Sequence, residues 1–149
     1  MNNYARFAAM VSTSTVVMFG LMYLSTYTWD HLYFSESMAY MALVMGATMA
    51  VIMLAFMLGM YSNRLANTAI LVGSVAVFGA ALWLVRSQAT VDDVSWMKAM
   101  IPHHSMAILT SERARINDPR VRKLADEIID SQRREIEQMK ALVDELQAQ

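Results

Sequence analysis

The chain has 149 residues with 12 basic and 13 acidic side chains, and it contains no cysteine. This balance lacks the basic excess of nucleic-acid-binding proteins, and the absence of cysteine excludes disulfides, thiolate metal sites and cysteine nucleophiles. Residues 1–85 hold only four of the charges: Arg6, Asp30, Glu36 and Arg64. The sequence therefore predicts two unlike parts, a membrane domain over residues 1–88 and an extramembrane domain over residues 89–149.

Three apolar stretches are each long enough to cross the hydrocarbon core of a bilayer, which takes about 20 helical residues. They run from about 7 to 29, from 38 to 61 and from 65 to 85, and none of them contains a charged residue. The first stretch is longer than the apolar segment of a typical signal peptide, and no clean cleavage site follows it, so we interpret it as a retained span. We expect an all-α protein with three transmembrane helices in the lipid bilayer.

The few charges near these stretches predict an orientation. Arg6 precedes the first stretch and Arg64 lies in the turn between the second and the third. The loop between the first two stretches has Asp30 and Glu36 but no lysine or arginine. The positive-inside rule then places the N-terminus in the cytoplasm and residues 89–149 on the periplasmic or extracellular side of the inner (plasma) membrane. Arg86 alone favours the opposite orientation.

The second stretch carries two helical rows of different character. Ala42, Gly46 and Ala50 are small residues four apart, which lets helix backbones approach closely in lipid, and Gly73 and Gly79 thin one side of the third stretch. The methionines are either flexible apolar filler or a thioether ladder for a soft monovalent cation such as Cu(I), and both interpretations stay open. Seven of them share one helix face: Met38, Met41, Met45, Met49, Met53, Met57 and Met60.

The extramembrane part is predicted to begin with a helix over about 91–115. Thr90 and Asp93 resemble a capping box at its start. Pro102 removes the backbone hydrogen bond to the carbonyl of Lys98 and should kink this helix. A row along the helix is apolar except for one histidine and a terminal serine: Val94, Met97, Ile101, His104, Ile108 and Ser111.

A second helix is predicted over about 119–146. Asp118 and Pro119 are typical of an N-cap followed by a proline in the first turn. Its heptad-like seam alternates spacings of four and three, and the polar residues Gln132 and Glu135 interrupt the seam. The predicted seam is Val121, Ala125, Ile128, Gln132, Glu135, Met139, Leu142 and Leu146.

Polar residues of the two helices should meet in an antiparallel hairpin. His104 and the pair Gln132 and Glu135 lie at similar distances from the turn, and polar groups at a seam cost stability unless they are paired or bind something. One interpretation is a hydrogen-bonded cluster that sets the register, and the other is a metal site that also uses Met100 and His103. Because adjacent helical residues point about 100° apart, the two histidines need ligands from a partner helix to share one ion.

Two amphipathic helices make a thin core, so we expect the hairpin to pair with a second copy. The product would be a four-helix bundle with an inward-facing metal site. The alternative is that the apolar edge beside the seam only broadens the contact within the chain. This edge consists of Leu124, Ile129, Ile136 and Val143.

Several segments together resemble a known family. Met100-Ile-Pro-His-His-Ser-Met-Ala-Ile108, the Asp118-Pro119 turn and Gln132-x-x-Glu135-Ile136-x-x-Met139 resemble domain-of-unknown-function family 305 over about residues 92–146. That family is ferritin-like and includes the CopM-like copper-binding proteins. The resemblance implies a helical bundle outside the cytoplasm that handles copper or silver. The positions it marks as metal ligands are Met100, His103, His104, Gln132, Glu135 and Met139.

The expected function is extracytoplasmic binding of copper, as Cu(I), for tolerance or delivery and without catalysis. Thioethers prefer Cu(I) and do not form disulfides in an oxidising compartment. The alternative is a structural or assembly subunit of a membrane complex with no metal role, in which the polar cluster is only architectural. A di-metal carboxylate oxidoreductase ranks third, because that chemistry needs several carboxylates and only Glu135 lies on the seam.

Overall fold

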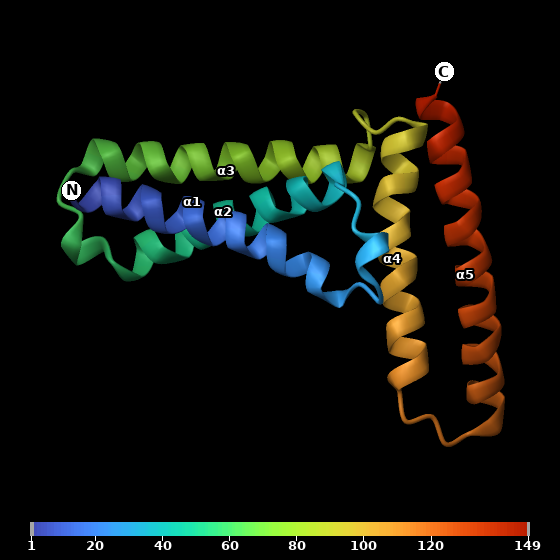
Figure 1. The fold of residues 1–149 in the computed structure, drawn as a ribbon. Helices are drawn as coiled ribbons and strands as arrows, with labels where there is room; N and C mark the ends of the chain where they lie inside the picture. The colour runs from blue at the N-terminus through green and yellow to red at the C-terminus, as the bar shows by residue number, and fades with distance from the viewer. Residues whose placement is uncertain (1, 149) are drawn as a thin grey trace. The chain divides into compact units, whose positions relative to one another are not determined.

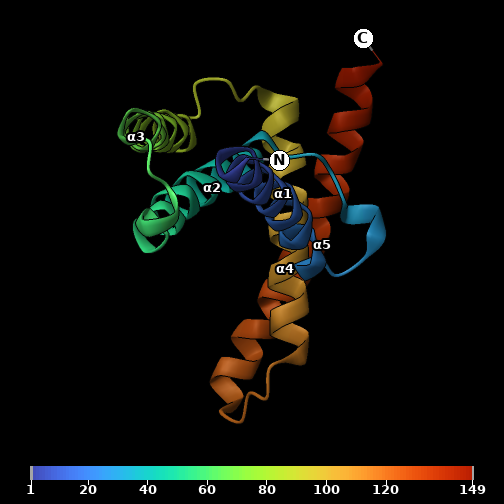
Figure 2. The ribbon, with the colours of Figure 1, turned by 90° about the vertical axis from the view of Figure 1, so that its left-hand side faces the viewer.

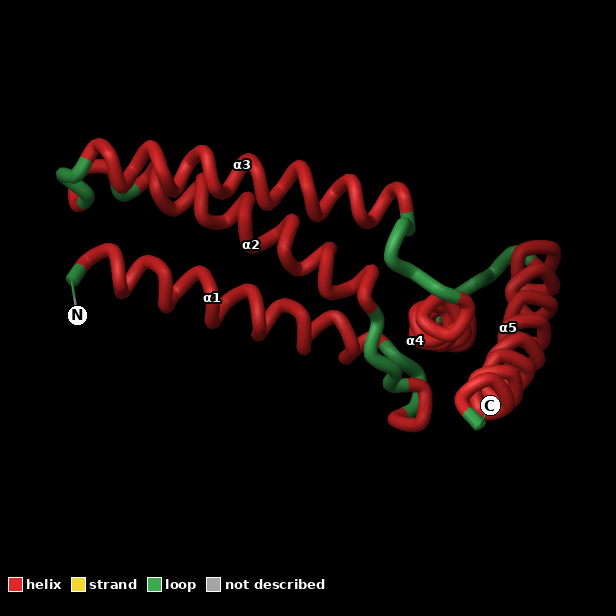
Figure 3. The backbone as a smooth tube through the Cα atoms, turned by 90° about the horizontal axis from the view of Figure 1, so that it is seen from above, coloured by secondary structure: helices red, strands yellow, loops and turns green. Residues whose placement is uncertain are grey.

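The computed structural model describes residues 2–148, and within this range the protein is all-α, as the sequence predicts. Figure 3 shows helices joined by short loops. The chain divides into two compact units. One unit holds the residues up to Leu21 together with Ser37–Thr90, and the other holds Met22–Glu36 together with the residues from Val91 onward. The loop between the first two long helices therefore belongs with the C-terminal hairpin, which the predicted boundary at residue 88 did not include.

The first unit contains three long helices that run side by side (Figures 1 and 3). They are α1 (Asn3–Met22), α2 (Glu36–Phe56) and α3 (Arg64–Ser87). All three are long and apolar enough to cross a membrane. Helix α1 begins before the predicted range and ends earlier, because the 3₁₀ turn η1 (Tyr23–Ser25) and an extended Thr26 follow it. Helix α2 likewise ends before the 3₁₀ turn η3 (Leu58–Met60).

Helices α1 and α2 approach through the predicted small residues. Ala42, Gly46 and Ala50 are buried. A Cβ atom on Gly46 would collide with the side chain of Thr15, whose Oγ1 is the nearest atom and whose Cβ would lie 3.2 Å away, so a larger residue requires Thr15 to move. The expectation for α3 is wrong, however, because Gly73 and Gly79 have no neighbouring atoms within 4 Å of such a Cβ.

The second unit is built on the antiparallel hairpin of α4 (Asp93–Arg113) and α5 (Pro119–Gln147), which lie side by side in Figures 1 and 2. The predicted cap at Asp118 is confirmed, since its side chain accepts a hydrogen bond from the backbone N–H of Arg120 at 2.8 Å. The predicted capping box of α4 is wrong. Asp92 caps this helix by accepting from the N–H of Ser95 at 2.7 Å.

The core of the hairpin corrects part of the predicted seam. Ala125 and Met139 of the seam are buried, but four of its apolar members stay 37–49% exposed. These exposed residues are Val121, Ile128, Leu142 and Leu146. Three residues of the predicted free edge lie in the core instead: Ile129, Ile136 and Val143. Two apolar rows lie about 100° apart on α5, and only the contact with α4 decides which one is buried.

Candidate functional site

Two of the polar residues that interrupt the rows, His104 and Glu135, meet as predicted. The Nε2 atom of His104 lies 2.7 Å from Oε2 of Glu135, and its Nδ1 lies 3.0 Å from the carbonyl oxygen of Met100. The hydroxyl of Ser131 donates to Oε1 of Glu135 at 2.6 Å. These hydrogen bonds, first from Ser131 and then from His104, lower the pKa of the Glu135 carboxyl. Both partners of His104, the Met100 carbonyl and the Glu135 carboxylate, are hydrogen-bond acceptors.

His103 has a different environment from its neighbour. Its side chain is exposed, and its ring lies 6.1 Å from that of His104 in an edge-to-face arrangement. Met100 precedes it by three residues and packs half-buried against the edge of the core. Met106 follows it by three residues and is 40% exposed. Residues three apart are neighbours on a helix surface, so α4 places one thioether on each side of the His103 imidazole.

Met106 was missed from the sequence, although its spacing from His103 was the available signal. Met139, by contrast, was proposed as a ligand and lies 7% exposed in the hydrophobic core beside Ile136 and Val143. Gln132 is half-buried on α5. The structure thus joins His104 to Glu135 and places Met100 and His103 next to them, while Met139 fills the core.

The side chains that α4 gathers around His103 are two thioethers and one imidazole. Among residues 2–148 no group of three or more histidine, cysteine, aspartate or glutamate side chains is arranged to hold a metal ion. Thioethers and imidazoles are ligand types that Cu(I) and Ag(I) accept. We name the group formed by Met100, His103 and Met106 the α4 thioether face.

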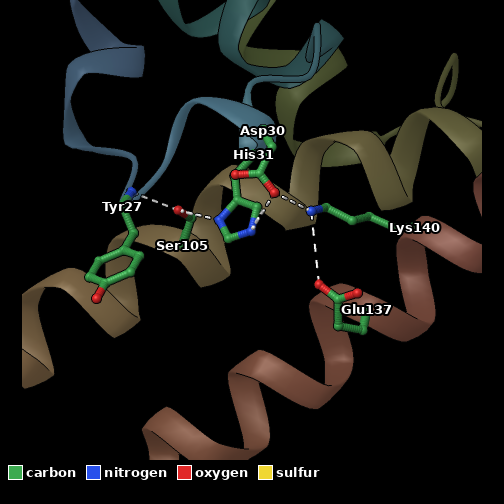
Figure 4. A network of polar contacts seen from close by, with 6 residues as sticks. All are labelled: Tyr27, Asp30, His31, Ser105, Glu137 and Lys140. Carbon is green, nitrogen blue, oxygen red and sulfur yellow. Dashed lines mark hydrogen bonds and ion pairs between the residues drawn. The ribbon is translucent and has the colours of Figure 1, made fainter.

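A second polar cluster lies in the same unit and was not foreseen. The strap, residues 23–35 between α1 and α2, packs on the hairpin (Figure 4). His31 is only 9% exposed, and its Nδ1 lies 2.9 Å from the Oγ of the fully buried Ser105. The backbone N–H of Tyr27 donates to the same Oγ at 2.7 Å. The Ser105 hydroxyl thus links the backbone of the strap at Tyr27 to the ring of His31.

An ion pair holds the strap to the other helix. The Nζ of Lys140 on α5 lies 2.6 Å from Oδ2 of Asp30 and 3.9 Å from Oε1 of Glu137. The same Asp30 oxygen lies 3.7 Å from Nε2 of His31. The hydrogen bond from Lys140 holds the pKa of the Asp30 carboxyl well below its usual range. Burial lowers the pKa of His31, against the attraction of Asp30.

Ser105, His31 and Asp30 are the three residue types of a serine hydrolase triad, but the serine here is not accessible to a substrate. Ser105 has no exposed surface, so a substrate cannot reach its hydroxyl. Its Oγ also accepts the backbone N–H of Tyr27. Asp30 is engaged mainly by Lys140 rather than by the imidazole. The arrangement attaches the strap to the hairpin, and its chemistry is that of a buried hydrogen-bond network.

The attachment of the strap is expected to weaken on mild acidification. His31 has a lowered pKa when docked and about 6.5 when released, so the released form binds the extra proton. The stabilisation is therefore complete above about pH 6.5, declines as pH falls from that value towards the lowered pKa, and stays reduced below it. Asp30 keeps its charge until more acidic pH, because its pKa is lowered too. Hydrogen exchange of the backbone amides of residues 27–35 is measured at pH 7 and at pH 5. The ratio of the exchange rate in wild type to the rate in His31→Gln should be higher at pH 5 than at pH 7.

The matched control for this experiment is His103→Gln, which removes an exposed imidazole from the same hairpin. Comparing variants at each pH cancels the intrinsic pH dependence of exchange. If wild type and His31→Gln keep the same ratio of exchange rates at both pH values, titration of His31 does not control the strap.

Comparisons with known proteins agree with the position of the hairpin. Residues 84–149 match the family described as Domain of unknown function (DUF305). Over 81 residues the chain is 40% identical to "Uncharacterized protein L153" of Acanthamoeba polyphaga mimivirus. The matched region covers 53% of this chain and 53% of that protein. The chain thus spans about half the length of this curated relative. No solved structure matches it. Neither description names a catalytic activity.

Proposed function

The C-terminal part of the chain, residues 84–149, belongs to the DUF305 family, and from this premise we propose that the protein is a membrane-anchored binder of Cu(I) or Ag(I). Its hairpin acts outside the cytoplasm, in metal tolerance or in delivery to another protein. The observation that carries the proposal is the α4 thioether face, where the imidazole of His103 is exposed between two methionines three residues away.

His104 has a supporting role in this proposal. Both of its ring nitrogens are engaged, one by the Met100 carbonyl and one by Glu135. A metal ion needs a free nitrogen lone pair, so His104 binds metal only if Glu135 moves away. His103 has no such competition among the hydrogen bonds of the described residues. The exposed histidine is therefore the first ligand, and His104 with Glu135 fixes the adjacent turn of α4.

The membrane anchor is supported by an internal consistency. Only α2 and α3 lie between the strap and the hairpin, so if both of these helices cross the membrane the two segments lie on the same side. Their direct hydrogen bonds, from Tyr27 to Ser105 and from Lys140 to Asp30, require that they share one side. A single crossing between the strap and the hairpin would separate them.

The proposal predicts which methionines matter for metal affinity. Replacing Met100 and Met106 with leucine keeps volume nearly constant, at a cost usually below about 1.5 kcal/mol, while removing both thioethers. Loss of a residue that only hydrogen-bonds a metal ligand lowers metal affinity by roughly 10- to 100-fold. We expect the loss of the two thioethers to lower Ag(I) affinity by more than this. His103→Ala should lower it similarly. The measurement is competition for Ag(I) against a chromophoric chelator, with the full chain in detergent.

Met139→Leu is the matched control, because it removes a thioether from the core rather than from the exposed face. It should retain wild-type affinity. Zn(II) and Mn(II) should bind much more weakly than Ag(I), since thioethers contribute little to harder ions. Wild type that takes up no Ag(I), or a double variant as tight as wild type, contradicts the proposal. The first result would favour the structural or assembly subunit, whose polar clusters only hold the hairpin together.

A further inference from the structure

Helix α5 carries a row of exposed apolar side chains that nothing in the chain covers, within residues 2–148. Its members are a third to more than half exposed: Leu124 at 56%, Ile128 at 37%, Leu142 at 40% and Leu146 at 41%. We call these four residues the open row. They are large aliphatic side chains, and covering them with a partner removes apolar surface from water, which favours association.

The open row is symmetric about Glu135. Ile128 and Leu142 lie seven residues before and after this glutamate, and Leu124 and Leu146 lie eleven residues before and after it. Seven and eleven residues are close to two and three helical turns, so all four side chains lie on the line of Glu135 along α5. A helix with this pattern matches itself when it is reversed.

We infer that α5 packs antiparallel against α5 of a second copy, with the two-fold axis at Glu135. Ile128 then contacts the partner's Leu142, and Leu124 contacts the partner's Leu146. Each apolar residue thus meets an apolar residue at the same distance from the axis, which is the self-complementarity that a two-fold interface requires. A parallel arrangement would instead place each residue against its own copy.

The side of α5 away from the open row already makes polar contacts within the chain. Arg133 pairs there with Glu112, and Arg122 bonds the carbonyl of Ser111 at 3.0 Å. The strap is attached on that side through Lys140. These positions lie about 100–180° around α5 from the open row, judged from helical spacing. The charges are thus gathered away from the open row, which leaves the apolar side for a second copy.

The inferred packing also brings Glu135 close to the partner's Glu135. Each carboxylate is hydrogen-bonded by His104 and Ser131 of its own chain. Like charges near the axis oppose association, so Glu135→Gln should strengthen the dimer while still accepting a bond from Ser131. This inference rests on the proposed function in one respect: it makes the metal-binding protein a dimer, with two α4 thioether faces in one four-helix bundle.

The absence of cysteine allows a direct test by disulfide cross-linking of the full chain in detergent. Ile128→Cys and Leu142→Cys are prepared separately and then mixed under mild oxidation. We expect the mixed disulfide dimer to form at least about tenfold faster than the dimer of either variant with itself. Leu124→Cys mixed with Leu146→Cys should behave in the same way. Asp130→Cys, exposed on the charged side of α5, is the matched control and should not cross-link.

Rapid cross-linking of Ile128→Cys with itself would show parallel packing and overturn the inference. The inference is also overturned if Asp130→Cys cross-links as fast as the mixed pairs, or if no variant cross-links. Helix content by circular dichroism verifies that each variant is folded. Native mass spectrometry of the cysteine-free wild type and of Glu135→Gln gives an independent measure, and the dimer fraction should rise in the glutamine variant. Ag(I) titration separates the two claims, because a linked dimer that binds no Ag(I) defeats only the metal proposal. Ag(I) binding by a protein that stays monomeric defeats only the dimer.

Discussion

Replacing Ile136 with alanine is expected to lower the free energy of unfolding of the hairpin by about 2–5 kcal/mol. Ile136 is 1% exposed and belongs to the α4–α5 core together with Ile101, Ile108 and Val143. Removing three carbon atoms there loses their burial and leaves a cavity that two rigid helices cannot fill completely. A two-helix unit has little other apolar burial to compensate. Hydrogen exchange of α5 amides, followed by mass spectrometry, measures this loss for the hairpin itself.

Leu124→Ala is the matched control, because it removes a similar aliphatic side chain that is 56% exposed. Surface substitutions of this kind usually change stability by less than about 0.5 kcal/mol. The comparison is made at low protein concentration, so that contact between copies does not contribute. Equal losses in the two variants would mean that α5 does not bury Ile136 in preference to Leu124.

A reporter fused after residue 149 is expected to be active only outside the cytoplasm. Arg6 and Arg64 flank the cytoplasmic ends that the positive-inside rule predicts, whereas the strap carries Asp30 and its partner histidine but no lysine or arginine. With three crossings the C-terminus lies opposite the N-terminus. An alkaline phosphatase fusion should therefore be active and a green fluorescent protein fusion dark, an all-or-none difference.

The strap provides the internal control for this experiment. A reporter inserted after Trp29, which is 82% exposed, should report the same side as the C-terminal fusion. A fusion after Ser62, between α2 and α3, should report the opposite side. Cytoplasmic activity of the C-terminal fusion would reverse the orientation, and it would remove the basis for metal handling outside the cytoplasm.

The sequence by itself determined the local features of this protein. Three long apolar runs require helices, because the backbone groups of a chain in lipid must bond within their own segment. Asp118 followed by Pro119 ends the turn and starts α5, since both the cap and the fixed proline dihedral act within one turn. The contact of His104 with Glu135 also followed from the sequence, because both lie at similar distances from a short turn.

Only the tertiary structure decided which row of α5 is buried. The sequence places one apolar row through Ile128 and Leu142 and another through Ile129 and Val143, and helical periodicity fits both. The choice depends on the shape of α4 opposite them. The same contact moved Met139 into the core, away from the exposed histidine.

The strap was also beyond the reach of sequence reasoning. His31 and Ser105 are 74 residues apart, and Asp30 and Lys140 are 110 residues apart, so no local pattern links them. Their meeting requires that the loop after α1 and the hairpin after α3 come to the same place, which only the packing of the whole second unit specifies. Helical periodicity predicts what each helix offers to a neighbour, but the identity of the neighbour is decided by the tertiary structure.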